Sequence, residues 1–369
     1  MKKINLAKPF LDKNEKDMVL KCLESTRISS NGKFIKQFEN KFANLLNGGN
    51  AVTVSNGTTA LQLALAVFKI GIGDEVIIPD FTYPAPMNAI IHSGAKPVLV
   101  DVHTHNWVIN EDKLIDAITK KTKAIIVVHT YGQVANMDKI KKIAKKYKLF
   151  IIEDCAEALG CKYKNRMVGN LSDCSTFSFY GNKIITTGEG GMVVFKKKTH
   201  ANLAKILRNQ GKTDTKNFIN EHIGFNFRMT NIQAAIGLSQ INKLQRLFKK
   251  REEIFNFYNF YFSKMPFVTI PHYSKNYRQS FWMYTLLLNK KNRNDRNKIV
   301  KQMNNIGIEV RPGFQSLHLQ PAYKKFSKTK FKNSSYLSSK TISFPTHFFL
   351  SQKILMKIIN TFKKIYDRT

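Results

Sequence analysis

The segment AIIVVHTYGQVANMDKIKKIAKKYKLFIIED, residues 124–154, has the pattern of a strand, a helix and a second strand. Residues 124–128 and 150–152 are apolar without interruption, as strands buried on both faces of a sheet should be. Between them, residues 137–147 repeat apolar and lysine positions with the period of a helix that lies on a surface. The segment therefore predicts two buried strands joined by a covering helix.

The same alternation continues outward, from residue 55 to residue 195. It predicts strands over residues 75–78 and 97–100, and helices over residues 58–68, 86–92 and 111–119. Alternating strands and helices are typical of an α/β domain whose sheet is mainly parallel.

The pattern changes near Asn242. A long charged helix is predicted over residues 243–262, a strand over 282–288, a helix over 295–305, and a last helix before Thr369. We therefore expect a large α/β domain over residues 1–242 and a smaller C-terminal α+β domain over residues 243–369.

The composition is that of a folded globular protein. The chain has 369 residues, of which 43% are hydrophobic and 23% are charged. Sixty Lys and Arg against 25 Asp and Glu give a net charge of +35, which by itself would favour a nucleic-acid partner. The lysines are spread along helix patterns such as residues 139–146, and no single arm concentrates them. We therefore interpret the charge as a solvated surface and do not expect a nucleic-acid partner.

Several further patterns restrict the class of protein. The four cysteines form no CxxC pair and no zinc-like spacing, which fits a reduced chain. His103, His105 and His129 show no spacing for metal ligation, so no metal is expected. The N-terminus lacks the apolar core of a signal peptide, and no apolar run reaches about 18 residues. We expect a cytoplasmic protein that does not span a membrane.

The stretch STFSFYGNKIITTGEGG, residues 175–191, is the most informative for function. Lys183 follows an apolar strand and precedes small residues and glycines, where its amine can lose water and be approached closely. Such a lysine can form a Schiff base with a carbonyl compound. From this pattern alone an ordinary surface lysine is the alternative, so the rest of the chain has to decide between them.

Two features upstream favour the reactive lysine. Asp154 stands at the carboxyl end of a buried strand, where α/β folds bind their ligands, and could keep a pyridine nitrogen protonated. Gly57 and Thr58 open a helix whose free N–H groups can hold a phosphate. Phosphate site, acid and lysine follow one another at the ends of strands, and together they match what pyridoxal phosphate requires.

At this point the sequence resembles a known family, the sugar aminotransferases of the DegT/DnrJ/EryC1/StrS type, over nearly its whole length. The resemblance implies an aspartate-aminotransferase-like architecture, the type I pyridoxal-phosphate fold. It also implies a homodimer with shared active sites, because the family completes its phosphate site from the neighbouring subunit. The segments that carry the resemblance are residues 55–58, 128–133, 153–158, 174–192, 224–237, 281–284 and 345–347.

The resemblance also implies a role for each matching residue. Lys183 would be the Schiff-base lysine, Asp154 would pair with the pyridine nitrogen, and Tyr83 would stack on the cofactor ring. Glu157 stands beside the cofactor's phenolic oxygen, where the family at large more often has Gln or His, and two oxyanions there would repel unless one carries a proton. The implied cofactor contacts are Gly57, Thr58, Tyr83, Asp154, Glu157, Ser178, Lys183 and, from the neighbouring subunit, Asn226; those to the substrate are Arg311, His318 and Tyr323.

The activity that the resemblance implies is a transamination in two halves. L-glutamate would leave its amine on the cofactor as pyridoxamine phosphate, and carbon 4 of a nucleotide-linked 4-keto-6-deoxyhexose would then receive it, for polysaccharide or glycan synthesis. Lys183 favours this reaction, since relatives that remove a sugar hydroxyl carry His there. The chain is most similar to members that use a GDP-linked sugar, which share Glu157. The alternatives within the enzyme class are a UDP- or dTDP-linked sugar substrate and amination of carbon 3. A more remote alternative is a non-catalytic basic protein that binds nucleic acid.

Overall fold

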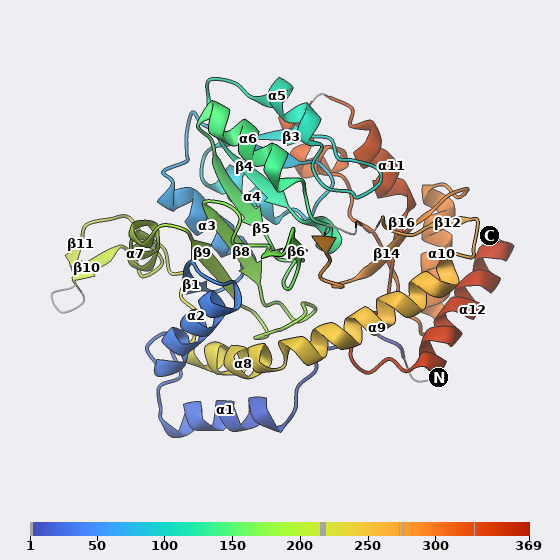
Figure 1. Cartoon of the computed structure of the whole chain (residues 1–369), viewed down its shortest axis with the longest axis horizontal. Coiled ribbons are helices and arrows are strands. Elements are labelled where there is room, and N and C mark those ends of the chain that lie inside the picture. Colours follow the sequence, from blue (N-terminus) through green and yellow to red (C-terminus); the bar gives the residue numbers. More distant parts are fainter. Residues whose placement is uncertain (1–2, 215–218, 273, 275–276, 328) are drawn as a thin grey trace.

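The computed structural model describes residues 3–214, 219–272, 274, 277–327 and 329–369. Its larger part is built on a seven-stranded sheet with the strand order β1-β9-β8-β5-β4-β2-β3 (Figure 1). Neighbouring strands are parallel except where β9 pairs with β1 and β8, so the expected mainly parallel sheet is confirmed. The strands are β1 (Asn50–Val54), β2 (Glu75–Pro79), β3 (Lys96–Val100), β4 (Thr122–Val128), β5 (Phe150–Asp154), β8 (Cys174–Ser178) and β9 (Gly191–Phe195).

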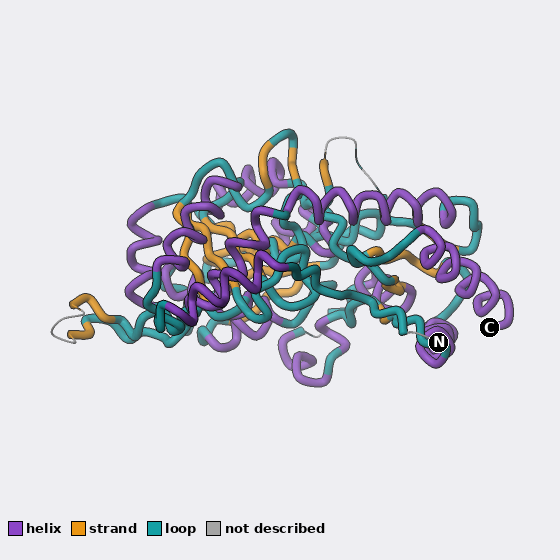
Figure 2. The backbone as a smooth tube through the Cα atoms, turned by 90° about the horizontal axis from the view of Figure 1, so that it is seen from below, coloured by secondary structure: helices purple, strands orange, loops and turns teal. Residues whose placement is uncertain are grey.

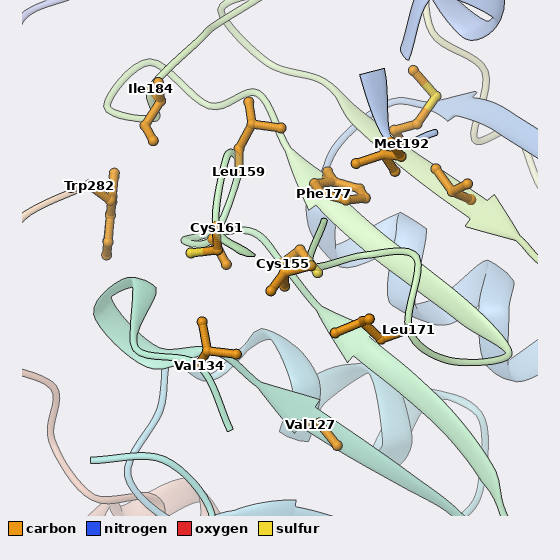
Figure 3. Packing of buried hydrophobic residues seen from close by; sticks show 14 of the residues in the cluster. Val127, Val134, Cys155, Leu159, Cys161, Leu171, Phe177, Ile184, Met192 and Trp282 are labelled. Atoms are coloured by element: carbon orange, nitrogen blue, oxygen red, sulfur yellow. The ribbon is translucent and has the colours of Figure 1, made fainter. Parts of the chain in front are cut away.

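Helices cover both faces of this sheet, because successive side chains of a strand point to opposite sides. On β4, Ile125 and Val127 belong to one buried cluster, and Ile126 and Val128 belong to another. Figure 3 shows part of the first cluster, with Cys155 near its centre and Val127 at its lower edge. Helices α1 (Lys13–Glu24), α2 (Lys33–Leu45), α6 (Met137–Tyr147) and α8 (Asn231–Asn242) contribute to the first cluster, and α3 (Gly57–Val67), α4 (Ala85–His92) and α7 (Lys198–Leu207) to the second.

A second, smaller body has its own antiparallel sheet, in the order β12-β14-β16-β15, and its own buried cluster. Figure 2 shows the two bodies side by side in an elongated molecule, with the strands β10 (Lys212–Asp214) and β11 (Ile219–Asn220) projecting from one end. The elements of the smaller body are β12 (Val268–Thr269), β14 (Tyr284–Leu288), β15 (Arg311–Pro312), β16 (Thr341–Phe344), α9 (Leu244–Phe262), α10 (Arg293–Asn305), α11 (Lys332–Lys340) and α12 (Gln352–Arg368).

The connection between the two bodies is less simple than the predicted division at residues 242 and 243. Helix α8 ends and α9 begins on either side of Lys243, whose Nζ lies 2.6 Å from an oxygen of Glu15. However, the start of the chain returns to the smaller body: Ile4 forms a bridge with Ile308, and the N–H of Leu6 donates to Glu309. The first residues therefore pack on the smaller C-terminal body, which the sequence pattern did not indicate.

Residues from beyond the predicted boundary at residues 242 and 243 also pair with strands of the larger body. Strand β13 (Tyr277–Arg278) pairs with β6 (Lys162–Tyr163), which in turn pairs with β7 (Arg166–Met167). The remaining short elements are 3-10 turns over Glu111–Lys113, Thr130–Gly132, Leu317–Leu319 and Pro321–Phe326.

Two predicted elements are shorter than expected. The helix predicted over residues 111–119 consists of the first of these 3-10 turns and the short α5 (Leu114–Ala117), because Ile118 is extended and Thr119 bonds to Glu75 at 2.6 Å. The strand predicted over residues 282–288 begins only at Tyr284. Within the described residues, no helix has the length and apolar character needed to cross a membrane.

Candidate active site

The carboxyl ends of β4, β5 and β8 and the start of α3 converge on one cavity of about 620 Å³. A cavity of similar volume, about 630 Å³, runs along the edge strand β3, but none of the residues predicted for the site lines it. The first cavity is therefore the candidate site, in agreement with the rule that α/β sheets bind ligands at the carboxyl ends of their strands. Its lining includes Gly57, Thr58, Tyr83, Asp154, Glu157, Ser178, Lys183 and Arg311.

One end of the cavity is suited to an anion. Asn56 caps α3 by accepting from the N–H of Thr59 at 2.9 Å, which leaves the first-turn N–H groups of Gly57 and Thr58 on the cavity wall. A Cβ added to Gly57 would lie 2.9 Å from the Cβ of Ser178, so a larger residue would close the space between helix and strand. Helix N-terminal N–H groups and a serine around a narrow hollow are suited to a phosphate.

Asp154 supplies the acid at the end of β5. Its side chain accepts from the N–H of Ala156 at 3.1 Å and is otherwise directed to the cavity that it lines. Burial raises the pKa of this carboxyl, although the nearby Lys183 opposes the shift. A cationic partner in the cavity would favour the ionised carboxylate.

Lys183 reaches the cavity from the turn that follows β8. Its own N–H donates to the carbonyl of Tyr180, and its Nζ lies 3.9 Å from the ring centre of Trp282. Burial lowers the pKa of the amine, while Glu157 and Asp154 act in the opposite direction. A lowered pKa leaves more of the amine neutral, which is the form that acts as nucleophile or base.

Glu157 lines the same cavity as these two groups, and its surroundings bear on its charge. Its carboxylate accepts from the N–H of Tyr131 at 2.6 Å, which is possible because Tyr131 adopts a left-handed backbone with φ of 54°. Burial raises the pKa of Glu157, Asp154 adds to the rise, and Lys183 and the Tyr131 bond oppose it. The net direction favours a proton on Glu157, which would allow it to face another oxygen without repulsion.

A buried network behind β5 supports Asp154. His129 lies at the end of β4, accepts from the N–H of Ala135 through Nδ1 at 3.3 Å, and faces Glu153 through Nε2 at 3.3 Å. Glu153 and Cys155 lie close enough to His129 to suggest a metal cluster. Since Glu153 also accepts from two backbone N–H groups and Ser172, its oxygens are already used within the protein.

The substrate-side residues do not all reach the cavity. Arg311 lines it and pairs with Glu309 at 2.8 Å. His318 and Tyr323 lie outside it: a ring nitrogen of His318 lies 2.7 Å from Asp80, and the hydroxyl of Tyr323 bonds to Asn88 at 2.7 Å. These hydrogen bonds connect the two residues to other parts of the chain. Because neither residue lines the cavity, their contact with the substrate stays a prediction.

Tyr83 and Asn226 present more surface. Tyr83 is 58% exposed and lines the cavity. Asn226 is exposed, does not line its own cavity, and accepts from Arg228 at 2.8 and 3.0 Å. That Asn226 completes the phosphate site of a neighbouring subunit stays a prediction.

Sequence reasoning assigned no role to the aromatic wall of the cavity. Tyr131 stacks on Phe314 with ring centres 4.7 Å apart, and Trp282 stacks on the other side at 6.0 Å. These rings come from three distant parts of the chain, so no local pattern could have grouped them. The only local signals were the Tyr-Gly pair after β4 and the aromatic pair that precedes β14.

A lysine, a buried acid and the start of a helix lie together at the carboxyl ends of a mainly parallel sheet, an arrangement suited to pyridoxal phosphate in an enzyme of the type I fold. Residues 9–363 match the DegT/DnrJ/EryC1/StrS aminotransferase family, and the chain belongs to that family. The protein is thus a pyridoxal-phosphate-dependent aminotransferase.

The relatives and the similar structures agree with this assignment over the full length. The chain is 41% identical over 358 residues to GDP-perosamine synthase of Caulobacter vibrioides, which covers 97% of this chain and 96% of the relative. It is 40% identical over 368 residues to GDP-perosamine synthase of Escherichia coli O157:H7, over 100% of both chains. A putative sugar aminotransferase from Streptococcus pneumoniae, solved in its PLP form, has a TM-score of 0.95 at 28% identity and covers 99% of both chains. PseC of Helicobacter pylori, an aminotransferase of pseudaminic acid synthesis, has a TM-score of 0.95 at 29% identity over 100% of both chains.

Proposed function

We propose that the enzyme transfers an amine from L-glutamate to carbon 4 of a GDP-linked 4-keto-6-deoxyhexose, as a GDP-perosamine synthase. The proposal rests on the convergence of Lys183, Asp154 and the start of α3 in one cavity, within a chain about 40% identical to two such synthases over its full length. A third relative of that name, from Vibrio cholerae, is 36% identical over 99% of this chain. A relative involved in spore coat polysaccharide synthesis, 33% identical, supports a role in making a surface polysaccharide.

The cavity fits pyridoxal phosphate on three independent observations. Gly57 leaves a hollow that a Cβ would fill, with helix N–H groups and Ser178 around it for the phosphate. The buried Asp154 has an ionisable carboxyl for the pyridine nitrogen, and the amine of Lys183 lies in the same cavity for the aldehyde carbon. Tyr83 would cover the ring, and a protonated Glu157 would donate to the phenolic oxygen.

The residues of the chain divide the reaction between them. When bound, the cofactor withdraws electrons from the carbon that carries the reacting amine and holds the amine between the two half-reactions. Lys183 Nζ would move a proton from the α-carbon of glutamate to the cofactor carbon that keeps the amine in the first half, and from that carbon to sugar carbon 4 in the second half. Asp154 holds the positive charge of the ring nitrogen, and the aromatic wall excludes water on the side of Lys183.

We further propose a homodimer in which Asn226 completes the phosphate site of the partner. Its exposed position, away from its own cavity, supports this arrangement. A mixture of Lys183→Ala and Asn226→Ala chains should then recover activity, because one site of the mixed dimer carries neither change. The four cysteines are free and buried, which fits the reducing cytoplasm as the compartment.

The choice of nucleotide is tested by direct competition. Turnover of GDP-, UDP- and dTDP-linked 4-keto-6-deoxy sugars with L-glutamate should favour the GDP sugar, and the product should carry its amine on carbon 4. A preference for the dTDP sugar would instead favour the activity of a 33% identical relative, a dTDP-3-amino-3,6-dideoxygalactose transaminase. Purified protein without a yellow absorbance that borohydride bleaches would refute the enzyme itself.

A further inference from the structure

The indole ring of Trp282 contacts the amine of Lys183, and the proposed reaction assigns no role to this contact. Its side chain is buried, and its ring centre lies 3.9 Å from Lys183 Nζ. Its indole Nε1 donates to the carbonyl of Asn182 at 3.0 Å, one residue before the lysine. The ring of Tyr131 also packs on Trp282, nearly parallel to it at 20°, with ring centres 6.0 Å apart. Trp282 is thus held by its hydrogen bond to Asn182 and by its ring contact with Tyr131.

Arg251 of α9 contacts both the segment that contains Trp282 and the turn that contains Lys183. It donates to the carbonyl of Trp282 and, at 3.5 Å, to the carbonyl of Lys183. Its side chain is buried, and no carboxylate of a described residue pairs with it. Burial alone lowers the pKa of this guanidinium, to about 10, so it stays charged at neutral pH. The two carbonyl hydrogen bonds are therefore what mainly offsets the cost of burying the Arg251 charge. Through them Arg251 links the turn that contains Lys183 to the segment before β14.

A cation above an aromatic face is stabilised, most strongly by Trp and more so where water is excluded. We propose that Trp282 is a positioning residue that holds the free ammonium of Lys183 during the steps in which this amine is not bonded to the cofactor. Arg251 fixes the Trp282 ring and the lysine turn relative to each other. The inference rests on the proposed role of Lys183 as the lysine that releases and regains its bond to the cofactor.

The other charged groups around the amine do not perform this task. The Asp154 carboxylate attracts the ammonium by charge, but Asp154 and the protonated Glu157 are also the groups that the cofactor would engage. Glu189 and Arg311 line the same cavity, and Arg311 is already paired with Glu309. The indole face is uncharged, so it can hold the ammonium without competing for the cofactor's polar atoms.

The test measures the free amine directly, in full-length protein loaded with pyridoxamine phosphate. Trace labelling with acetic anhydride from low to high pH, followed by mass spectrometry of the Lys183 peptide, gives the labelling midpoint of that single amine. Trp282→Leu removes the aromatic face, and Trp282→Phe keeps a weaker face but loses the bond to Asn182. Tyr258→Phe is the control, because Tyr258 is a fully buried aromatic residue of the smaller body whose hydroxyl also donates to a carbonyl, at 3.0 Å.

The proposal expects a lower midpoint in Trp282→Leu, so that below the midpoint Lys183 is labelled roughly ten-fold faster at the same pH. Trp282→Phe should lie between this variant and the unchanged protein, and Tyr258→Phe should leave the midpoint unchanged. A faster label at every pH with an unmoved midpoint would show only a more open site and would overturn the proposal. If Trp282→Leu does not fold, an unmoved midpoint in Trp282→Phe overturns it as well. Failure of the proposed function is seen separately, as a protein whose Lys183 never forms the yellow bond to pyridoxal phosphate.

Discussion

Replacing Glu153 by Gln should destabilise the larger body although the two side chains have the same shape. In the structure, Oε1 accepts from the N–H of Leu171 and the hydroxyl of Ser172, and Oε2 accepts from His129 Nε2 and the N–H of Gly169. In either orientation, the amide nitrogen of Gln would face one of these donor pairs. The hydroxyl of Ser172 can rotate to accept, but a backbone N–H cannot.

The expected loss in free energy of unfolding follows from the hydrogen bonds that Glu153 accepts. At least one buried N–H loses its acceptor, which costs roughly 1–3 kcal/mol, and hydrogen bonds to a charged acceptor are lost, roughly 1.5–3 kcal/mol. His129 cannot compensate by moving its proton, since Nδ1 already accepts from Ala135. We therefore expect Glu153→Gln to lower the free energy of unfolding by about 3–5 kcal/mol near neutral pH.

The effect should also depend on pH in one direction. Burial would raise the pKa of Glu153, but the bonds from His129, Gly169 and Ser172 outweigh it and lower the pKa in the folded state. A carboxyl with a lowered folded pKa adds stability above its unfolded pKa, about 4.3, and loses that contribution as the pH falls through the folded pKa. The difference between the two proteins should therefore be full at neutral pH and shrink below about pH 4.3.

Urea unfolding followed by circular dichroism, without added cofactor, measures this difference. Glu24→Gln, at an exposed position of α1, is the control and should lie within about 0.5 kcal/mol of the unchanged protein. If Glu153→Gln unfolds at the same urea concentration as that control, the buried network does not support the site as argued.

Three further predictions concern the reaction itself. Lys183→Ala should fold, bind pyridoxal phosphate without a covalent bond and lose transamination by several orders of magnitude; more than a few per cent of activity would exclude Lys183 as the reactive lysine. Asp154→Asn should keep the fold and lose most activity, because an amide cannot balance a charged ring nitrogen; an unchanged single-turnover rate with glutamate would contradict the pairing. If the charge of +35 attracts an anionic substrate, kcat/KM should fall between ~0.02 and ~0.5 M salt with little change in kcat, and a flat kcat/KM would reject steering. Strong inhibition by duplex DNA would instead restore the nucleic-acid partner.

The sheet was predictable because its signal is local. Strands buried on both faces are expected to carry uninterrupted apolar runs, and residues 76–79 of β2, 97–100 of β3, 124–128 of β4 and 150–152 of β5 form such runs. Helix α3 was predictable for the same reason, since its cap and its glycine stand next to one another in the chain. The order of Gly57, Asp154 and Lys183 at strand ends likewise pointed to one site, because parallel strands present their carboxyl ends at one edge.

Other features depended on contacts between distant segments. The return of Leu6 to Glu309, the bond of His318 to Asp80 and the shortened helix before Thr119 each join residues far apart in the chain. A pattern read over one window contains only the segment itself, so it cannot indicate which partner will compete for a polar group.

By itself, the sequence determined the α/β fold and the cofactor, and it predicted Lys183 and Asp154 as the reactive lysine and acid, since each depends on a short run of residue types at a strand end. Only the tertiary structure decided the state of those groups. Burial lowers the pKa of Lys183 and raises that of Glu157, and the left-handed turn at Tyr131 delivers the N–H that Glu157 accepts. Trp282 reaches the lysine from a segment 99 residues further along the chain. Desolvation and ring contact arise only when such segments pack together, because both depend on what surrounds a group in space and not on its neighbours in the chain.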